Sequence, residues 1–124
     1  MFLVPKSICV YSSSSDRLDD RYFAAARELG RLMAQRGHTL VFGGGNIGLM
    51  NAMAVAAQES GGRVVGVIPV ALRERKWCLE SCDELIVTDG MRDRKAIMEE
   101  RAEAFIAMPG GFGTLEELLE IITL

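Results

Sequence analysis

The sequence predicts an α/β fold in three layers, a doubly wound parallel sheet with helices on both faces. Short apolar runs and longer helical stretches alternate five times along the chain, which is typical of parallel strands joined by crossover helices. Polar or glycine-rich turns follow several of these runs, at the edge where such a sheet binds ligands. The chain has 124 residues, 49% of them apolar, so we expect one domain, residues 1–124, with a substantial core.

The first half of the chain is expected to form two strands, each followed by a helix. The strands are residues 7–11 and 39–42. Residues 19–35 carry an apolar stripe at helical spacing, and Gly37 ends this helix. The stripe consists of Tyr22, Ala26, Leu29 and Met33. Residues 48–59 form a helix that is apolar nearly all round, which indicates either a subunit interface or cover within one monomer.

The second half continues the alternation. Further strands are expected at residues 63–68, 84–87 and 104–108, the last of them buried. Residues 70–81 are charged and irregular, with at most a short helix. A helix capped by Thr88 or Asp89 runs to about residue 102, and the last helix opens at Thr114. Residues 118–124 are still helical in pattern without a glycine cap, so we expect the chain to stop inside or just after this helix.

Composition excludes several classes of function. The net charge of −3 argues against a nucleic-acid partner, and no apolar run reaches the ~20 residues that span a bilayer. The odd number of cysteines, with Cys9 inside an apolar strand, indicates reduced thiols in a cytoplasmic protein. Cys78 and Cys82 lack a second pair or a nearby histidine to complete a metal site. His38 precedes a strand, and we interpret it as structural.

Two turns near the first strands are candidate ligand contacts. Residues 43–48 fit G-x-G-x-x-G between a strand and a helix, but they follow the second strand and lack the later acidic residue of a dinucleotide site. We therefore expect close backbone approach there to a ligand or to a neighbouring turn. The hydroxyls and amides of residues 12–15 suit a phosphate or a ribose, although a serine-rich loop with an N-cap is the simpler explanation.

The remaining turns supply cations, amides and carboxylates. Arg92, Arg94 and Lys95 crowd the first turn of a helix, where the dipole favours an anionic partner; a solvated turn balanced by acids is the alternative. After the fifth strand, three glycines lead into a helix N-terminus that suits an anion. Glu116 and Glu117 lie one turn into this helix, where carboxylates are unexpected unless they do chemistry or cap the helix. Thr114 and Glu117 also fit a capping box, which local sequence alone favours.

Three motifs together resemble the LOG (Lonely Guy) family, whose members are often labelled "possible lysine decarboxylase". They are residues 43–50 (GGGNIGLM), 91–95 (MRDRK) and 109–117 (PGGFGTLEE). The resemblance implies a Rossmann-like homodimer that hydrolyses the N-glycosidic bond of nucleoside 5′-monophosphates, with cytokinin riboside monophosphates and AMP as substrates and no cofactor. Free base and ribose 5-phosphate would be the products. It also implies that family members continue past Leu124, so the domain here would lack its C-terminal part.

The resemblance also assigns roles to residues. Arg94 and Glu117 would form the catalytic pair. The expected substrate and phosphate contacts are Lys95, Gly110, Gly111, Phe112, Gly113, Thr114, Leu115, Glu116 and Thr123, with Ser14, Gly44 and Gly45 from the earlier turns. The sequence shows no pyridoxal phosphate site, so it does not support the decarboxylase label.

Four positions depart from the family pattern and bear on base specificity. They are Ser13, Asn51, Lys76 and Arg92, where the family more often has glycine, glycine, glutamate and histidine respectively. A carrier of the same fold, similar to molybdenum-cofactor carrier proteins, is the alternative function. A fragment left inactive by an incomplete dimer is a third.

Overall fold

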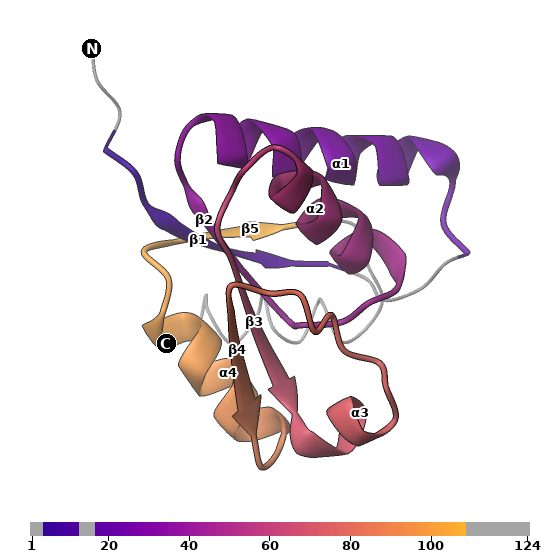
Figure 1. The fold of residues 1–124 in the computed structure, drawn as a ribbon, viewed down its shortest axis with the longest axis vertical. Coiled ribbons are helices and arrows are strands. Elements are labelled where there is room, and N and C mark those ends of the chain that lie inside the picture. Colours follow the sequence, from indigo (N-terminus) through magenta and orange to yellow (C-terminus); the bar gives the residue numbers. More distant parts are fainter. Residues whose placement is uncertain (1–3, 13–16, 109–124) are drawn as a thin grey trace.

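The computed structural model describes residues 4–12 and 17–108 of the chain. In this part, five parallel strands form one sheet in the order β4-β3-β2-β1-β5 (Figure 1). The strands are β1 (Ser7–Tyr11), β2 (Thr39–Phe42), β3 (Val64–Pro69), β4 (Glu84–Thr88) and β5 (Ala104–Ala107). The helices are α1 (Asp20–Gln35), α2 (Gly48–Glu59), α3 (Val70–Glu74) and α4 (Met91–Glu100). The predicted α/β class and all five strands are confirmed.

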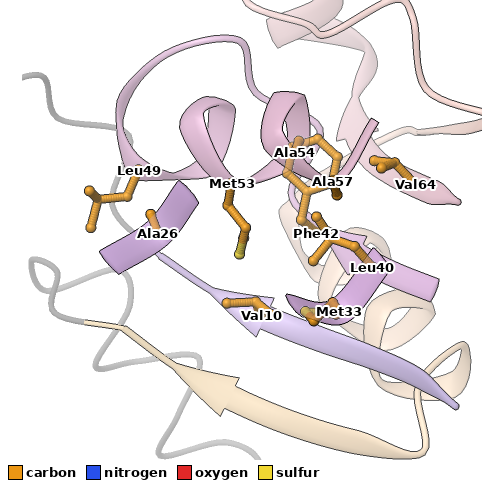
Figure 2. Packing of buried hydrophobic residues seen from close by; sticks show 10 residues of the cluster. All are labelled: Val10, Ala26, Met33, Leu40, Phe42, Leu49, Met53, Ala54, Ala57 and Val64. Atoms are coloured by element: carbon orange, nitrogen blue, oxygen red, sulfur yellow. The ribbon is translucent and has the colours of Figure 1, made fainter. Parts of the chain in front are cut away.

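Helices α1 and α2 cover one face of the sheet. Figure 2 shows their buried side chains meeting those of the strands beneath, among them Met33, Met53 and Phe42. The predicted stripe on α1 faces this core, with Ala26 and Met33 buried. The two helices touch closely at Gly30, where a Cβ atom would lie only 2.2 Å from the carbonyl oxygen of Met53. Gly30 therefore sets how near α1 can approach α2.

Helix α4 covers the opposite face, against β3 and β4 (Figure 1). Its Met98 packs with a second buried cluster, which includes Cys9 and Tyr11. Val10, between these two residues on β1, belongs instead to the cluster under α1 and α2. Alternate residues of β1 thus serve opposite faces, as the pleat of a strand requires. The three-layer, doubly wound arrangement is confirmed.

The strand order places a topological switch between β1 and β5. The chain moves outward from β1 through β2 and β3 to β4, and α4 then returns it to the other side of β1. In open parallel sheets, ligands bind beyond the carboxyl ends of the strands at such a switch. The N–H of Met108, just after β5, donates to the carbonyl of Tyr11 at 2.8 Å. The predicted glycine motif begins one residue later.

Two local predictions were wrong. Neither Thr88 nor Asp89 caps α4: Gly90 occupies the N-cap without a side-chain bond, and the Thr88 hydroxyl donates to the Gly90 carbonyl at 3.0 Å. Strand β5 was predicted to be buried but alternates between half-buried and exposed residues, because it is the last strand in the order of the described sheet.

None of the helices among residues 4–12 and 17–108 is long and apolar enough to cross a membrane.

Candidate active site

Arg94 is the cation that the fold buries at the carboxyl edge of the sheet. It lies in the first turns of α4 and is only 8% exposed. Its Nε donates to the carbonyl of Val67 at 2.9 Å, and its Nη2 donates to the carbonyl of Gly43 at 2.8 Å. These two bonds to the ends of β3 and β2 fix the guanidinium in orientation. The fold thereby holds a positive charge in a fixed position at this edge of the sheet.

Gly43 makes room for this guanidinium. A Cβ atom at position 43 would lie 1.9 Å from Arg94 Nη2, so any side chain would displace it. The sequence predicts that a ligand or a neighbouring turn lies close to the backbone of the glycine turn. The group that approaches is instead the side chain of Arg94, a member of the predicted catalytic pair. The turn therefore contributes to the site by positioning this cation.

Replacing Gly43 by alanine is expected to lower activity about 100-fold, because a displacement of about 1 Å at a reacting group can cost that much. The melting temperature should fall as well, because the displaced Arg94 side chain loses its bonds to the carbonyls of Gly43 and Val67. Base release from AMP, the reaction that the family resemblance implies, is the assay. Gly90→Ala is the matched control: a Cβ at position 90 meets nothing within 4 Å. Full activity in Gly43→Ala would show that the observed Arg94 position is not needed.

Gly44 and Gly45 are bound into the protein by a neighbouring segment. Gly44 adopts a φ of 77°, and its carbonyl accepts the N–H of Leu79 at 2.8 Å. The N–H of Gly45 donates to the thioether of Met50 at 3.1 Å, and Gly45 pairs with Cys78 in an antiparallel bridge. The Met50 side chain thus stabilises the backbone of the glycine turn. The predicted phosphate contacts of both glycines stay predictions.

The other predicted contacts divide into described and undescribed residues. Lys95 follows Arg94 on α4 and is half-buried, whereas Arg92 is exposed, so the solvated-turn alternative fits Arg92 and not Arg94. Outside the described residues lie Ser14, residues 110–117 and Thr123.

Sequence reasoning included Ser12 in the candidate turn of residues 12–15, whereas it gave Gly43 and Met50 no role of their own within the motif of residues 43–50. The Ser12 hydroxyl, at the end of β1, is buried and has no hydrogen-bond partner in the part of the chain that the structure describes. Its hydroxyl and its place directly after a strand are the signals that made it a candidate contact. The roles of Gly43 and Met50 depend on contacts with other elements, as detailed above.

Among residues 4–12 and 17–108, no three His, Cys, Asp or Glu side chains are grouped so that they could hold a metal ion. Burial raises the pKa of the Cys82 thiol to about 12, and this thiol donates to the carbonyl of Leu79. Cys82 is therefore a protonated, unreactive thiol at neutral pH. His38 is structural, as predicted: its Nδ1 accepts the N–H of Lys6 at 3.0 Å.

Comparison with known proteins places the site in a family. The model of the family described as "Possible lysine decarboxylase" matches residues 50–124. The chain belongs to this family, the LOG family. It is 48% identical over 118 residues to "Cytokinin riboside 5′-monophosphate phosphoribohydrolase LOG" of Oryza sativa subsp. japonica, covering 95% of this chain and 49% of that protein. A Mycobacterium tuberculosis relative named cytokinin riboside 5′-monophosphate phosphoribohydrolase is 48% identical over 117 residues, covering 94% and 62%.

The chain spans about half the length of the plant relatives that it matches. Among solved structures, the molybdenum cofactor carrier protein of Chlamydomonas reinhardtii superposes with a TM-score of 0.83 at 26% identity, over 97% of this chain and 72% of that one. A molybdenum cofactor binding protein from Rippkaea orientalis gives a TM-score of 0.81 at 25% identity, over 98% and 72%. The Rossmann-like fold implied for a LOG family member is thereby confirmed.

Proposed function

We propose that this chain hydrolyses the N-glycosidic bond of nucleoside 5′-monophosphates and releases free base and ribose 5-phosphate, with no cofactor. Cytokinin riboside 5′-monophosphates and AMP are the proposed substrates, which makes the activity one of AMP nucleosidase type. The observation that carries the proposal is the buried Arg94 guanidinium, fixed between the ends of β2 and β3. Relatives at 44–48% identity bear the name phosphoribohydrolase.

Cleavage of this bond builds positive charge on the ribose. In the proposed mechanism, the carboxylate of Glu117 stabilises that charge and orients the attacking water. Arg94 keeps this carboxylate ionised beside the anionic substrate and, with Lys95, balances the phosphate charge. Backbone N–H groups of residues 111–114 bind the phosphate oxygens. Because two bonds already fix the Arg94 side chain, little reorganisation is needed when substrate binds.

Exchange of Glu117 separates chemistry from helix capping. Glu117→Ala is expected to lower base release from AMP and from isopentenyladenosine monophosphate at least 100-fold with little change in melting temperature. Glu117→Gln is the sharper variant: glutamine still completes a capping box but carries no charge. It should lose as much activity as the alanine variant, whereas the exposed Glu100→Ala should lose none. An active Gln variant would make Glu117 a helix cap.

A binding function without hydrolysis is the second candidate. It is supported by the likeness to structures titled as molybdenum cofactor carrier or binding proteins. A carrier needs a ligand cradle but not the pair of Arg94 and Glu117. If AMP raises the melting temperature of the wild-type chain while no base is released, the carrier function replaces the hydrolase.

We also propose that the chain forms a homodimer through the outer surface of α1 and α2. A groove of about 410 Å³ lies there, and its lining includes Val55 and Ala56 together with Arg27 and Glu59. Arg27 and Glu59 carry opposite charges and line the same groove, and in the proposed two-fold dimer they would pair across the interface. The cysteine thiols, none of them in a disulfide, agree with the cytoplasmic location that we propose.

The chain, of mass 13.6 kDa, is expected to sediment at twice that mass. Val55→Asp, in the groove, should shift it to the monomer, because a carboxylate buried at an apolar interface is unfavourable. Val87→Asp, on the exposed side of β4, is the control and should leave the dimer intact. Melting curves check that both variants fold. A dimer that persists in folded Val55→Asp would place the interface elsewhere.

A further inference from the structure

We infer that Trp77 determines base specificity by stacking its indole on the base of the bound nucleotide. This inference rests on the proposed function and names the part of the site that reads the base. Trp77 is the only tryptophan of the chain and is 47% exposed. Its indole offers a large, rigid aromatic surface with a polar N–H, a combination suited to recognition.

The segment that carries Trp77 is fastened to the glycine turn at three places. The carbonyl of Gly44 accepts the N–H of Leu79, and Gly45 pairs with Cys78. One residue further along the turn, the side-chain amide of Asn46 donates to the carbonyl of Lys76 at 3.0 Å. The connection from α3 to β4 thus runs back beside the end of β2 (Figure 1). Trp77 is held against the turn that positions Arg94.

The backbone at Trp77 is also bent and tied down. Lys76 has a φ of 64°, the only positive φ of a non-glycine residue in residues 4–12 and 17–108. Such a conformation is strained and persists only where surrounding contacts impose it. The N–H of Trp77 donates to the carbonyl of Leu72 at 3.1 Å. The indole therefore projects from a pre-organised backbone.

A cation covers one face of the Trp77 ring, while about half of the Trp77 surface remains exposed to solvent. The guanidinium of Arg75 lies over the ring, 5.3 Å from its centre, as in a cation–π pair. The exposed remainder is an aromatic surface of the kind on which nucleobases stack. The positive charge of Arg75 beside the ring favours an anionic ligand such as a nucleotide.

The distance along the turn suits a nucleoside monophosphate. Arg94 contacts Gly43, whereas the Trp77 segment pairs with Gly45, two residues or at most about 7 Å along the chain. The two backbone positions to which Arg94 and the Trp77 segment are attached are thus closer together than a nucleoside monophosphate is long, and we infer that its sugar and phosphate lie at Arg94 and its base at Trp77. The chemical class read at Trp77 is accordingly a planar heteroaromatic base.

The single tryptophan gives a direct spectroscopic test. AMP is mixed with the wild-type chain and indole emission is recorded before turnover; ribose 5-phosphate, which has no base, is the matched probe. We expect AMP to quench the emission and ribose 5-phosphate to leave it unchanged. Trp77→Phe, recorded in parallel, provides the background. Equal quenching by both ligands would overturn the inference, because the base would not be the cause.

Kinetics provides the second readout. Trp77→Ala should raise KM for AMP about tenfold, within the range that loss of one base–aromatic stack produces, and change kcat less than threefold. Trp77→Phe should retain most of the affinity, and Val87→Ala, another exposed apolar position, should match the wild type. Inhibition by ribose 5-phosphate should be the same in all four proteins.

The outcomes separate this inference from the proposed function. If AMP is hydrolysed with an unchanged KM in Trp77→Ala, the inference is wrong and the hydrolase function stands. If AMP neither binds to nor reacts with the wild-type chain, the proposed function fails and the inference fails with it. If Trp77→Ala instead turns a dimer into a monomer, Trp77 belongs to a subunit interface and the inference is again wrong.

Discussion

Replacing Arg94 by alanine should lower base release from AMP about 100- to 1,000-fold, since a fixed charge near the developing transition state is typically worth that much. Stability should fall as well. The carbonyls of Gly43 and Val67 would lose their donors in a buried setting, which costs about 1–3 kcal/mol for each unsatisfied group. Initial rates and urea denaturation measure the two effects.

Two further variants separate the sources of the Arg94 effect. Arg94→Lys keeps the charge but loses the planar group that reaches two carbonyls at once, so its activity should recover only in part. Arg36→Ala removes the same charge from an exposed position at the end of α1 and should behave as wild type. If Arg94→Ala loses stability but keeps full turnover, Arg94 serves the fold alone.

Replacing Gly30 by alanine should destabilise the fold by about 3 kcal/mol, at the upper end of overpacking effects. The new methyl group would meet the carbonyl oxygen of Met53 at 2.2 Å. Because the atom it meets is backbone, relief requires α1 and α2 to move apart and opens the core beneath them (Figure 2). In a chain of this length we expect a melting temperature lower by roughly 10 °C.

The sign of the Gly30 effect is itself a test. Alanine is a better helix former than glycine by about 1 kcal/mol, so helix propensity alone would make Gly30→Ala stabilising. The exposed Ala25→Gly variant on the same helix measures that propensity term without a packing change. Increased stability in Gly30→Ala would show that the helices are not in the close contact described.

Most of the fold could be predicted because its signals are local. The apolar runs that form β1 and β2 and the helical span of α2 were predicted to the residue, since period and composition change sharply at their ends. The predicted cap of α4 was wrong, because the Thr88 hydroxyl bonds to the carbonyl of Gly90 and Gly90 itself occupies the N-cap position. The sequence does not show which of these local arrangements forms. The exposure of β5 depends on the strand order, which is set by tertiary packing.

The site was predicted in part. Its chemistry-bearing residue types and its edge of the sheet follow from sequence, and Arg94 does lie there. The partner of Gly43 could not be predicted, because Arg94 is 51 residues away and comes from the helix on the opposite face. The role of Trp77 likewise depends on the pairing of Gly45 with Cys78, a contact without any local pattern. Glu117 stays a prediction, since residues 109–124 lie outside the described residues.

The fit of Arg94 into the space beside Gly43 constrains how the two positions can change during evolution. A larger residue at position 43 is compatible only with a smaller or differently placed residue at position 94. Each single exchange passes through a protein with an impaired site, whereas the double exchange need not be worse than either alone. The effects of the two exchanges should therefore not add, and Gly43→Ala should lower activity far less in an Arg94→Ala background than in the wild type.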